Sequence, residues 1–144
     1  MIIRQAVPDD AGSIETLLNE LGYPPADEKF VASAILNYRQ EGYRLLVGEL
    51  GDEVVAFISL HWFDMFHSKA MMGRITAFCV SDHVRSSGIG GELLRAAEQL
   101  FSEKGCSKIE VTCNLKRSRT HEFYLKNGYS IDSKRFIKSM MNDQ

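Results

Sequence analysis

A short run after an apolar stretch has the residue types and spacing of a phosphate-binding loop. Residues 75–80 read as a buried strand, Arg85 is followed by Gly88 and Gly90, and apolar residues then recur at helical spacing. The first N–H groups of a helix have no partner inside it, and the helix dipole makes that end positive. Glycine removes side chains that would hold a bulky anion away, and Arg85 adds a charge. The run therefore predicts a site for a phosphate-bearing ligand, although an ordinary turn into a helix would use the same residues.

Two common phosphate loops are excluded by these residues. A P-loop needs Gly-Lys-Ser or Gly-Lys-Thr, which the run lacks. The first glycine of a Rossmann fingerprint would fall at Ser86 or earlier. What remains is the pattern Arg-x-x-Gly-x-Gly.

That pattern, following a strand, resembles the acetyl-CoA pyrophosphate loop of the GNAT superfamily of N-acetyltransferases. Residues 121–129, His-Glu-Phe-Tyr-Leu-Lys-Asn-Gly-Tyr, resemble the second signature of the family. Residues 2–10 and 135–138 are similar to its opening strand with helix entry and to its final strand. Because the resemblance spans nearly the whole chain in the expected order, it implies a single GNAT domain over residues 1–144.

The resemblance implies how acetyl-CoA, the co-substrate, would be held. The pantetheine arm would bond to main-chain atoms of Phe78, Cys79 and Val80, where two parallel strands splay apart. The Val80 N–H would also donate to the oxyanion that forms during attack on the thioester. The pyrophosphate would lie on the loop formed by Arg85, Ser86, Ser87, Gly88, Ile89, Gly90 and Gly91.

The second signature implies a general acid. Tyr124, with Phe123 beside it, would protonate the departing CoA thiolate. A core tyrosine with its hydroxyl bonded elsewhere is the alternative. Asn114 and Arg117 are candidate contacts to CoA, with Arg119 a further candidate for its phosphates. A turn asparagine and a solvated basic helix entry explain these residues equally well.

No general base is evident. Many relatives carry a glutamate on the strand that here includes residues 74–78, and this chain has none there. His61, His67, His83 or a water chain are the open alternatives, and Thr76 can only position a water. The missing base slightly favours a second interpretation, a non-catalytic acyl-CoA-binding regulatory module. The tyrosine at 124 opposes it.

Composition excludes several other classes. Lys and Arg number 17 against 19 Asp and Glu, so no strong positive field indicates nucleic acid. The 3 cysteines are odd in number and lack Cys-x-x-Cys spacing, which argues against a metal site or disulfide framework and favours the cytoplasm. The sequence shows neither the pattern of a signal peptide nor an apolar run of membrane-spanning length, so we expect no signal peptide and no membrane partner.

The order of predicted elements indicates an α/β protein with a mixed, mostly antiparallel sheet of about seven strands flanked by four helices. Strands are expected at 2–6, 43–50, 54–62, up to 80, 108–113, and around 129 and 136, and helices at 10–21, 30–38, after 88 and at 118–126. Residues 21–38 and the irregular segment 62–72 are expected to recognise the acceptor, a small-molecule or peptide amine. The aromatic and methionine side chains of 62–72 would line its pocket, form a homodimer contact, or pack over the sheet.

Overall fold

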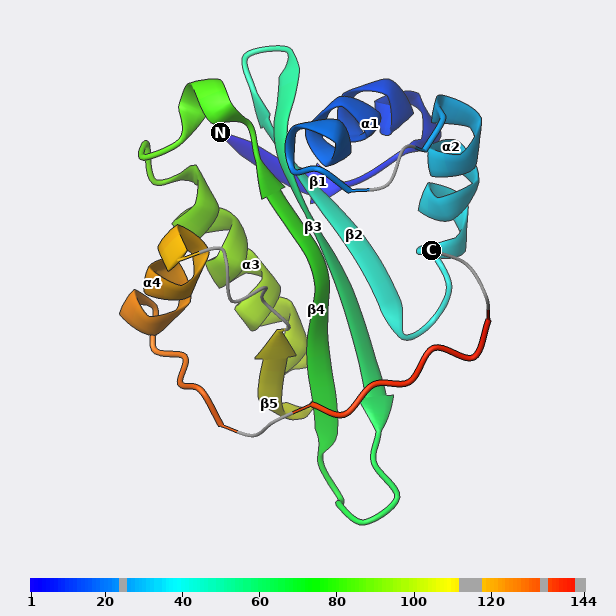
Figure 1. Cartoon of the computed structure of the whole chain (residues 1–144), viewed down its shortest axis with the longest axis vertical. Coiled ribbons are helices and arrows are strands. Elements are labelled where there is room, and N and C mark those ends of the chain that lie inside the picture. The colour runs from blue at the N-terminus through cyan, green and yellow to red at the C-terminus, as the bar shows by residue number, and fades with distance from the viewer. Residues whose placement is uncertain (24–25, 112–117, 133–134, 142–144) are drawn as a thin grey trace. The chain divides into compact units, whose positions relative to one another are not determined.

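The computed structural model describes residues 1–23, 26–111, 118–132 and 135–141, which fall into two compact units, Met1–Thr112 and Cys113–Gln144 (Figure 1). The first unit holds the sheet and the helices α1, α2 and α3, and the second holds α4. The sequence motifs that suit phosphate binding therefore belong to the first unit, and the tyrosine signature belongs to the second.

The described sheet has five strands in the order β1-β2-β3-β4-β5. Their bounds are β1 (Ile2–Gln5), β2 (Tyr43–Leu50), β3 (Glu53–Asp64), β4 (Met71–Val80) and β5 (Cys106–Val111). Neighbouring strands are antiparallel from β1 to β4, whereas β4 and β5 are parallel. Gly51, with φ of 63°, lies in the tight turn that joins β2 to β3, as the sequence predicts.

Helices cover both faces of this sheet. The helices α1 (Ala11–Glu20) and α2 (Glu28–Asn37) lie on one face, and α3 (Ile89–Glu103) lies on the other (Figure 1). Residues 55–60 of β3 are consequently buried at every position, without the alternation of a half-exposed strand. On the α3 face, a Cβ placed on Gly73 would come within 2.6 Å of the Phe101 ring, so β4 and α3 approach closely because residue 73 is glycine.

An ion pair joins β1 to the start of α1. The Arg4 guanidinium donates to both carboxylate oxygens of Asp10 at 2.8 and 2.9 Å, and the Val7 N–H donates to the same carboxylate at 2.8 Å. The Arg4 hydrogen bonds hold the pKa of Asp10 below its ordinary value. The sequence predicts Asp9 or Asp10 as a helix cap. Asp10 does occupy the N-cap position of α1, but its side chain bonds to β1 and to the connecting turn rather than to α1.

In the second unit, α4 (Ser118–Lys126) ends in a Schellman motif. The Gly128 N–H donates to the Leu125 carbonyl at 3.2 Å and the Tyr129 N–H to the Tyr124 carbonyl at 3.0 Å. Gly128 has φ of 93°, which glycine adopts without strain. The predicted glycine C-cap is therefore confirmed.

The expectation of about seven strands is wrong for the described residues. Strands were expected around Tyr129 and Phe136, but no strand pairing of the described residues extends beyond Val111. A strand forms only where its N–H and C=O groups pair with a neighbour, which β propensity alone does not provide. Several boundaries also differ. β5 begins at Cys106 rather than 108, α2 spans Glu28–Asn37 rather than 30–38, and the irregular segment shrinks to residues 65–70 because β3 and β4 extend as a hairpin.

Candidate functional site

The phosphate-loop sequence forms a strand, a short turn, a loop and a helix in direct succession. β4 ends at Val80, the 3-10 turn η2 (Asp82–Val84) follows, and α3 begins at Ile89. The first backbone hydrogen bond of α3 runs from the Glu92 N–H to the Gly88 carbonyl at 3.1 Å, so the preceding helical amides have no partner within the helix. No side chain caps this end. The arrangement leaves backbone donors pointing toward the loop, as an anion site requires.

Gly88 is required at this position by its backbone conformation. Its φ is 87°, in the left-handed region, and a Cβ placed on it would meet no atom within 4 Å. The glycine therefore serves the turn and leaves open space beside the helix amides. Ser86 also has a positive φ, of 70°, without being glycine.

Side chains of the loop tie it to the end of β4. Arg85 donates through Nε to the Val80 carbonyl at 3.3 Å and forms an ion pair with Asp82 at 2.8 Å. The Ser87 hydroxyl donates to the Val84 carbonyl. The Arg85 charge is thus held beside the loop, although its guanidinium is already paired with the Asp82 carboxylate.

The strand end that precedes the loop is well anchored on one side. Phe78, Cys79 and Val80 pair with Ile58, Phe57 and Ala56 of β3. On the other side, the described parallel ladder of β4 with β5 ends at the pair of Ile75 with Val111. β4 therefore runs further toward the loop than the described part of its parallel neighbour.

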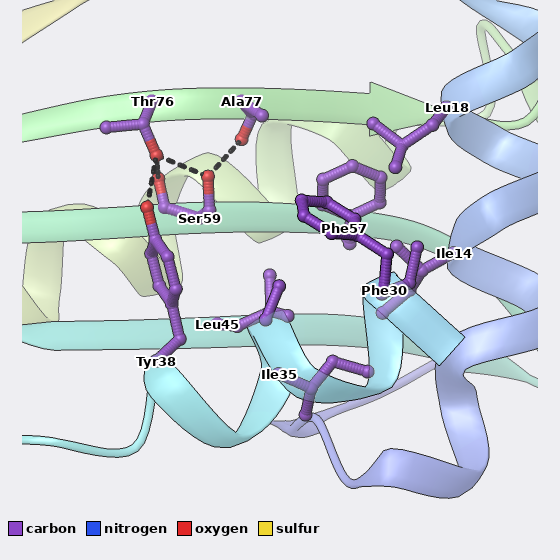
Figure 2. A pocket seen from close by; sticks show the side chains of 12 residues that line it. Ile14, Leu18, Phe30, Ile35, Tyr38, Leu45, Phe57, Ser59, Thr76 and Ala77 are labelled. Atoms are coloured by element: carbon purple, nitrogen blue, oxygen red, sulfur yellow. Dashed lines mark hydrogen bonds between the residues drawn. The ribbon is translucent and has the colours of Figure 1, made fainter. Parts of the chain in front are cut away.

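An open pocket of about 290 Å³ lies on the α1 and α2 face of the sheet (Figure 2). Apart from Tyr38, Ser59 and Thr76, every lining side chain is apolar. Its lining residues are Ile14, Leu18, Phe30, Val31, Ala34, Ile35, Tyr38, Leu45, Phe57, Ser59, Thr76 and Ala77. Ala77 is the residue before Phe78, so the pocket adjoins the end of β4 that the loop follows.

The hydroxyls of the pocket form one hydrogen-bonded chain (Figure 2). Thr76 Oγ1 lies 3.3 Å from the Tyr38 hydroxyl and 2.5 Å from Ser59 Oγ. The chain ends on two backbone carbonyls, those of Ser59 and Ala77. A register shift creates it: Ser59 pairs with Ala77 and Leu60 with Ile75, so Thr76 is the extra residue of a β-bulge.

The candidate bases lie elsewhere. His61 bonds through Nδ1 to the Gly42 carbonyl at 2.8 Å and stacks between Tyr43 and Phe63. His83 bonds to Ser81 at 2.7 Å. Neither histidine lines the pocket, and nor does His67. The described pocket therefore contains no histidine or carboxylate.

The remaining predicted site residues belong to the second unit or lie outside the described residues. Tyr124 is 7% exposed. Its ring packs edge-on against the rings of Phe123 and Tyr129, with 5.4 Å between ring centroids in each pair. Asn114 and Arg117 lie outside the described residues, as does the side chain of Arg119.

The aromatic segment 62–72 contributes no side chain to the described pocket, and its expected role in recognising the acceptor stays a prediction. Trp62 is buried on β3, where the Lys104 ammonium lies over its ring at 5.4 Å, while the Phe66 side chain is fully exposed. The sequence does not single out Ser59, and it places Tyr38 within the range 21–38 that is expected to recognise the acceptor without giving its hydroxyl a role. No spacing rule indicates the bulge that brings these hydroxyls together.

Other site types find no support in the described residues. No group of His, Cys, Asp and Glu side chains there is arranged to hold a metal ion. In the same ranges, no helix combines the length and apolarity needed to span a membrane. Cys79 and Cys106 form no disulfide within the described residues, and burial raises the pKa of the Cys106 thiol.

The chain is similar to several known proteins. Residues 12–129 match the model of the acetyltransferase (GNAT) family. The chain is 33% identical over 143 residues to an aminoalkylphosphonate N-acetyltransferase of Salmonella typhimurium, a match that covers 96% of this chain and 90% of that one.

Solved structures show the same fold. A glucosamine-6-phosphate N-acetyltransferase from Arabidopsis thaliana superposes with a TM-score of 0.83 at 19% identity, covering 97% of this chain and 98% of the other. A GNAT family acetyltransferase from Staphylococcus aureus gives a TM-score of 0.81 at 21% identity, with 96% and 98% covered.

Proposed function

This chain belongs to the GNAT acetyltransferase family and is an acyltransferase enzyme, and on that premise we propose that it moves an acetyl group from acetyl-CoA to a primary amine in a ternary complex. The family match spans parts of both compact units, which supports the further proposal that residues 1–144 act as one domain. One observation carries the function. The open pocket reaches β4 at Ala77, directly before the strand end that leads into the proposed phosphate loop.

The donor site is proposed on the end of β4 and the start of α3. Backbone atoms of Phe78, Cys79 and Val80 would bond to the pantetheine arm, and the amides at residues 88–91 would receive the pyrophosphate. The open space beside Gly88 and the absence of a side-chain cap on α3 fit a bulky diphosphate there. Arg85, Ser86 and Ser87 would complete the loop.

Acetyl-CoA supplies an acetyl thioester when bound, and the chain would supply orientation and hydrogen bonds. The pocket on the α1 and α2 face would place the amine beside β4. The Val80 N–H would stabilise the oxyanion, and the Tyr124 hydroxyl would protonate the thiolate that leaves. Asn114 and Arg117 keep their proposed roles as CoA contacts.

The acceptor is proposed to be a small molecule with a primary amine. The relative from Salmonella typhimurium carries the name aminoalkylphosphonate N-acetyltransferase, which supports an amine on a short chain. The size of the pocket, about 290 Å³, suits such a molecule.

Thermal denaturation of the protein alone and with acetyl-CoA, ATP or NAD tests the donor. A ligand that binds only the native state raises the free energy of unfolding by about 2.7 kcal/mol at a hundredfold excess over its Kd. We expect stabilisation by acetyl-CoA alone. Equal shifts with all three ligands would indicate a general phosphate site, and no shift at millimolar acetyl-CoA would contradict the proposal.

A further inference from the structure

The direction of the hydroxyl chain in the pocket follows from counting its protons. A backbone carbonyl only accepts, whereas each hydroxyl donates one proton. The short contact of Thr76 with Ser59 needs a proton between them. If Thr76 donated to Tyr38, Ser59 would have to donate to Thr76, and neither carbonyl at the end of the chain would receive a proton from these hydroxyls.

Therefore, in every assignment of the hydroxyl protons that lets Ser59 or Thr76 donate to one of those carbonyls, the Tyr38 hydroxyl donates to Thr76. Within the described residues, Thr76 is the one hydrogen-bond partner of the Tyr38 hydroxyl. The Tyr38 oxygen is then left with lone pairs, and the residue lines the pocket. Toward a ligand, this hydroxyl would then act as an acceptor.

The rest of the pocket offers no charge to a ligand. None of its lining side chains is cationic or anionic. Some of the charged groups on the neighbouring elements have partners of their own. Glu20 accepts from the Asp82 N–H, Asp27 from the Phe30 N–H, Arg39 donates to the Ala6 carbonyl, and Arg74 pairs with Glu110. Glu15, Glu28, Lys29 and Arg44, on α1, α2 and β2, are charged as well but do not line the pocket. An ammonium or a phosphonate placed among these apolar side chains would lose hydration without gaining a counter-ion from the pocket lining.

We propose that the pocket binds the acceptor as a neutral primary amine on an uncharged, apolar body, with the Tyr38 oxygen accepting a hydrogen bond from the amine N–H. This inference rests on the proposed function and deepens it by naming the acceptor class. An accepting hydroxyl orients the amine through its hydrogen and leaves the nitrogen lone pair free for attack. The amine gives its proton to solvent on binding, which accounts for a pocket without a carboxylate or histidine.

Calorimetric titration of the full chain with 2-phenylethylamine and with 2-aminoethylphosphonate tests the acceptor class without any turnover. We expect 2-phenylethylamine to bind at least about tenfold more tightly. Repeating the titration at pH 7 in buffers of different ionisation enthalpy counts protons, and we expect nearly one proton released for each amine bound. Tighter binding of the phosphonate, binding of neither amine, or binding without proton release would overturn the proposal.

Tyr38→Phe tests the acceptor hydroxyl, with Tyr43→Phe as the matched control. Tyr43 packs edge-on against Tyr38 at 5.2 Å but does not line the pocket. Loss of one hydrogen bond predicts an increase of about three- to tenfold in the Kd for 2-phenylethylamine in Tyr38→Phe. The Kd for acetyl-CoA, measured alongside, stays unchanged. An equal effect in both variants, or none in Tyr38→Phe, would contradict the role of Tyr38.

Failure of this inference and failure of the proposed function give different results. CoA release with 2-aminoethylphosphonate but not with 2-phenylethylamine would support acetyl transfer and overturn the acceptor class. Binding of 2-phenylethylamine with proton release, but without acetyl-CoA binding, would support the pocket assignment and contradict the acetyltransferase proposal.

Discussion

At the scale of single residues, Gly88 combines a backbone requirement with a proposed ligand contact. Its φ of 87° alone explains the glycine, so loss of function on replacement by a bulky residue would not identify a phosphate site. Asn and Asp both tolerate the left-handed conformation and both cap helices well. They differ mainly in charge, which allows the ligand contact to be measured separately.

We therefore expect Gly88→Asp to weaken acetyl-CoA binding at least about tenfold more than Gly88→Asn. A like charge about 4 Å from the diphosphate costs about 1 to 4 kcal/mol, and a factor of ten in affinity corresponds to about 1.4 kcal/mol. Calorimetry of both variants, with circular dichroism to check folding, measures the difference. Equal affinities would place the pyrophosphate elsewhere.

Tyr124→Phe should lower kcat while leaving the Kd of acetyl-CoA within about twofold. A general acid contributes about 10²- to 10⁴-fold, and a thiolate leaving group needs less help than most, so we expect the lower end or below it. The change keeps the ring that packs against Phe123 and Tyr129. A kcat equal to that of the parent across the pH range would remove the acid role.

Sequence reasoning identified the residues of contiguous motifs better than those brought together by pairing. The loop at Arg85 to Gly90 and the cap at Gly128 are local, because turn and helix-end conformations depend on neighbouring residues. Ser59 and Thr76 meet only because a bulge shifts the register of β3 against β4. Nothing in either strand alone indicates that contact.

At the scale of elements, the contact of β1 with α1 depends on the buried carboxylate of Asp10. Its pKa is lowered by the Arg4 hydrogen bonds, so the stabilisation is fully present above the unfolded value of about 3.9 and is lost as the pH falls through the lower, folded value.

We expect Asp10→Asn to lower the free energy of unfolding at pH 7 by about 1.5 to 3 kcal/mol, and the difference from the parent to shrink below about pH 4. Urea titrations at several pH values measure it. Asp9→Asn, at the exposed neighbouring position, is the control and should change little. A loss in Asp10→Asn that stays constant down to pH 2 would contradict the ionic account.

The packing of α3 on β4 depends on the glycine at 73. A Cβ there would lie 2.6 Å from the Phe101 ring, which is itself buried, so Gly73→Ala should destabilise the protein by about 1 to 3 kcal/mol. Adding Phe101→Leu should cost less in the Gly73→Ala background than in the parent. Denaturant midpoints of the three variants measure this, and additive losses would mean that the two side chains do not compete for the same space.

Element prediction was successful where periodicity and turns agree, and it failed where pairing decides. The helices at 11–20, 28–37 and 89–103 follow the apolar stripes of the sequence. By composition, the residues around Tyr129 and Phe136 suit strands as well as those of the observed strands do, yet they form no strand within the described residues. Strand formation requires a partner edge, which the sequence does not reveal.

At the scale of the whole molecule, the family and the fold class followed from the order of motifs along the chain, and the acceptor did not. The proposed donor contacts are mainly backbone groups, whose position a short motif can indicate. The proposed acceptor pocket draws its lining from α1, α2, β2, β3 and β4, so it emerges only when these elements pack.

The central claim is direct transfer of acetyl from acetyl-CoA to an amine, and mass spectrometry of both protein and small molecules tests it most directly. With acetyl-CoA and 2-phenylethylamine together, we predict acetylated amine and an equal amount of free CoA. With acetyl-CoA alone, we predict an unchanged protein mass. An acetylated protein formed before the amine is added would contradict direct transfer, and CoA release without any acetylated amine would contradict the acetyltransferase assignment itself.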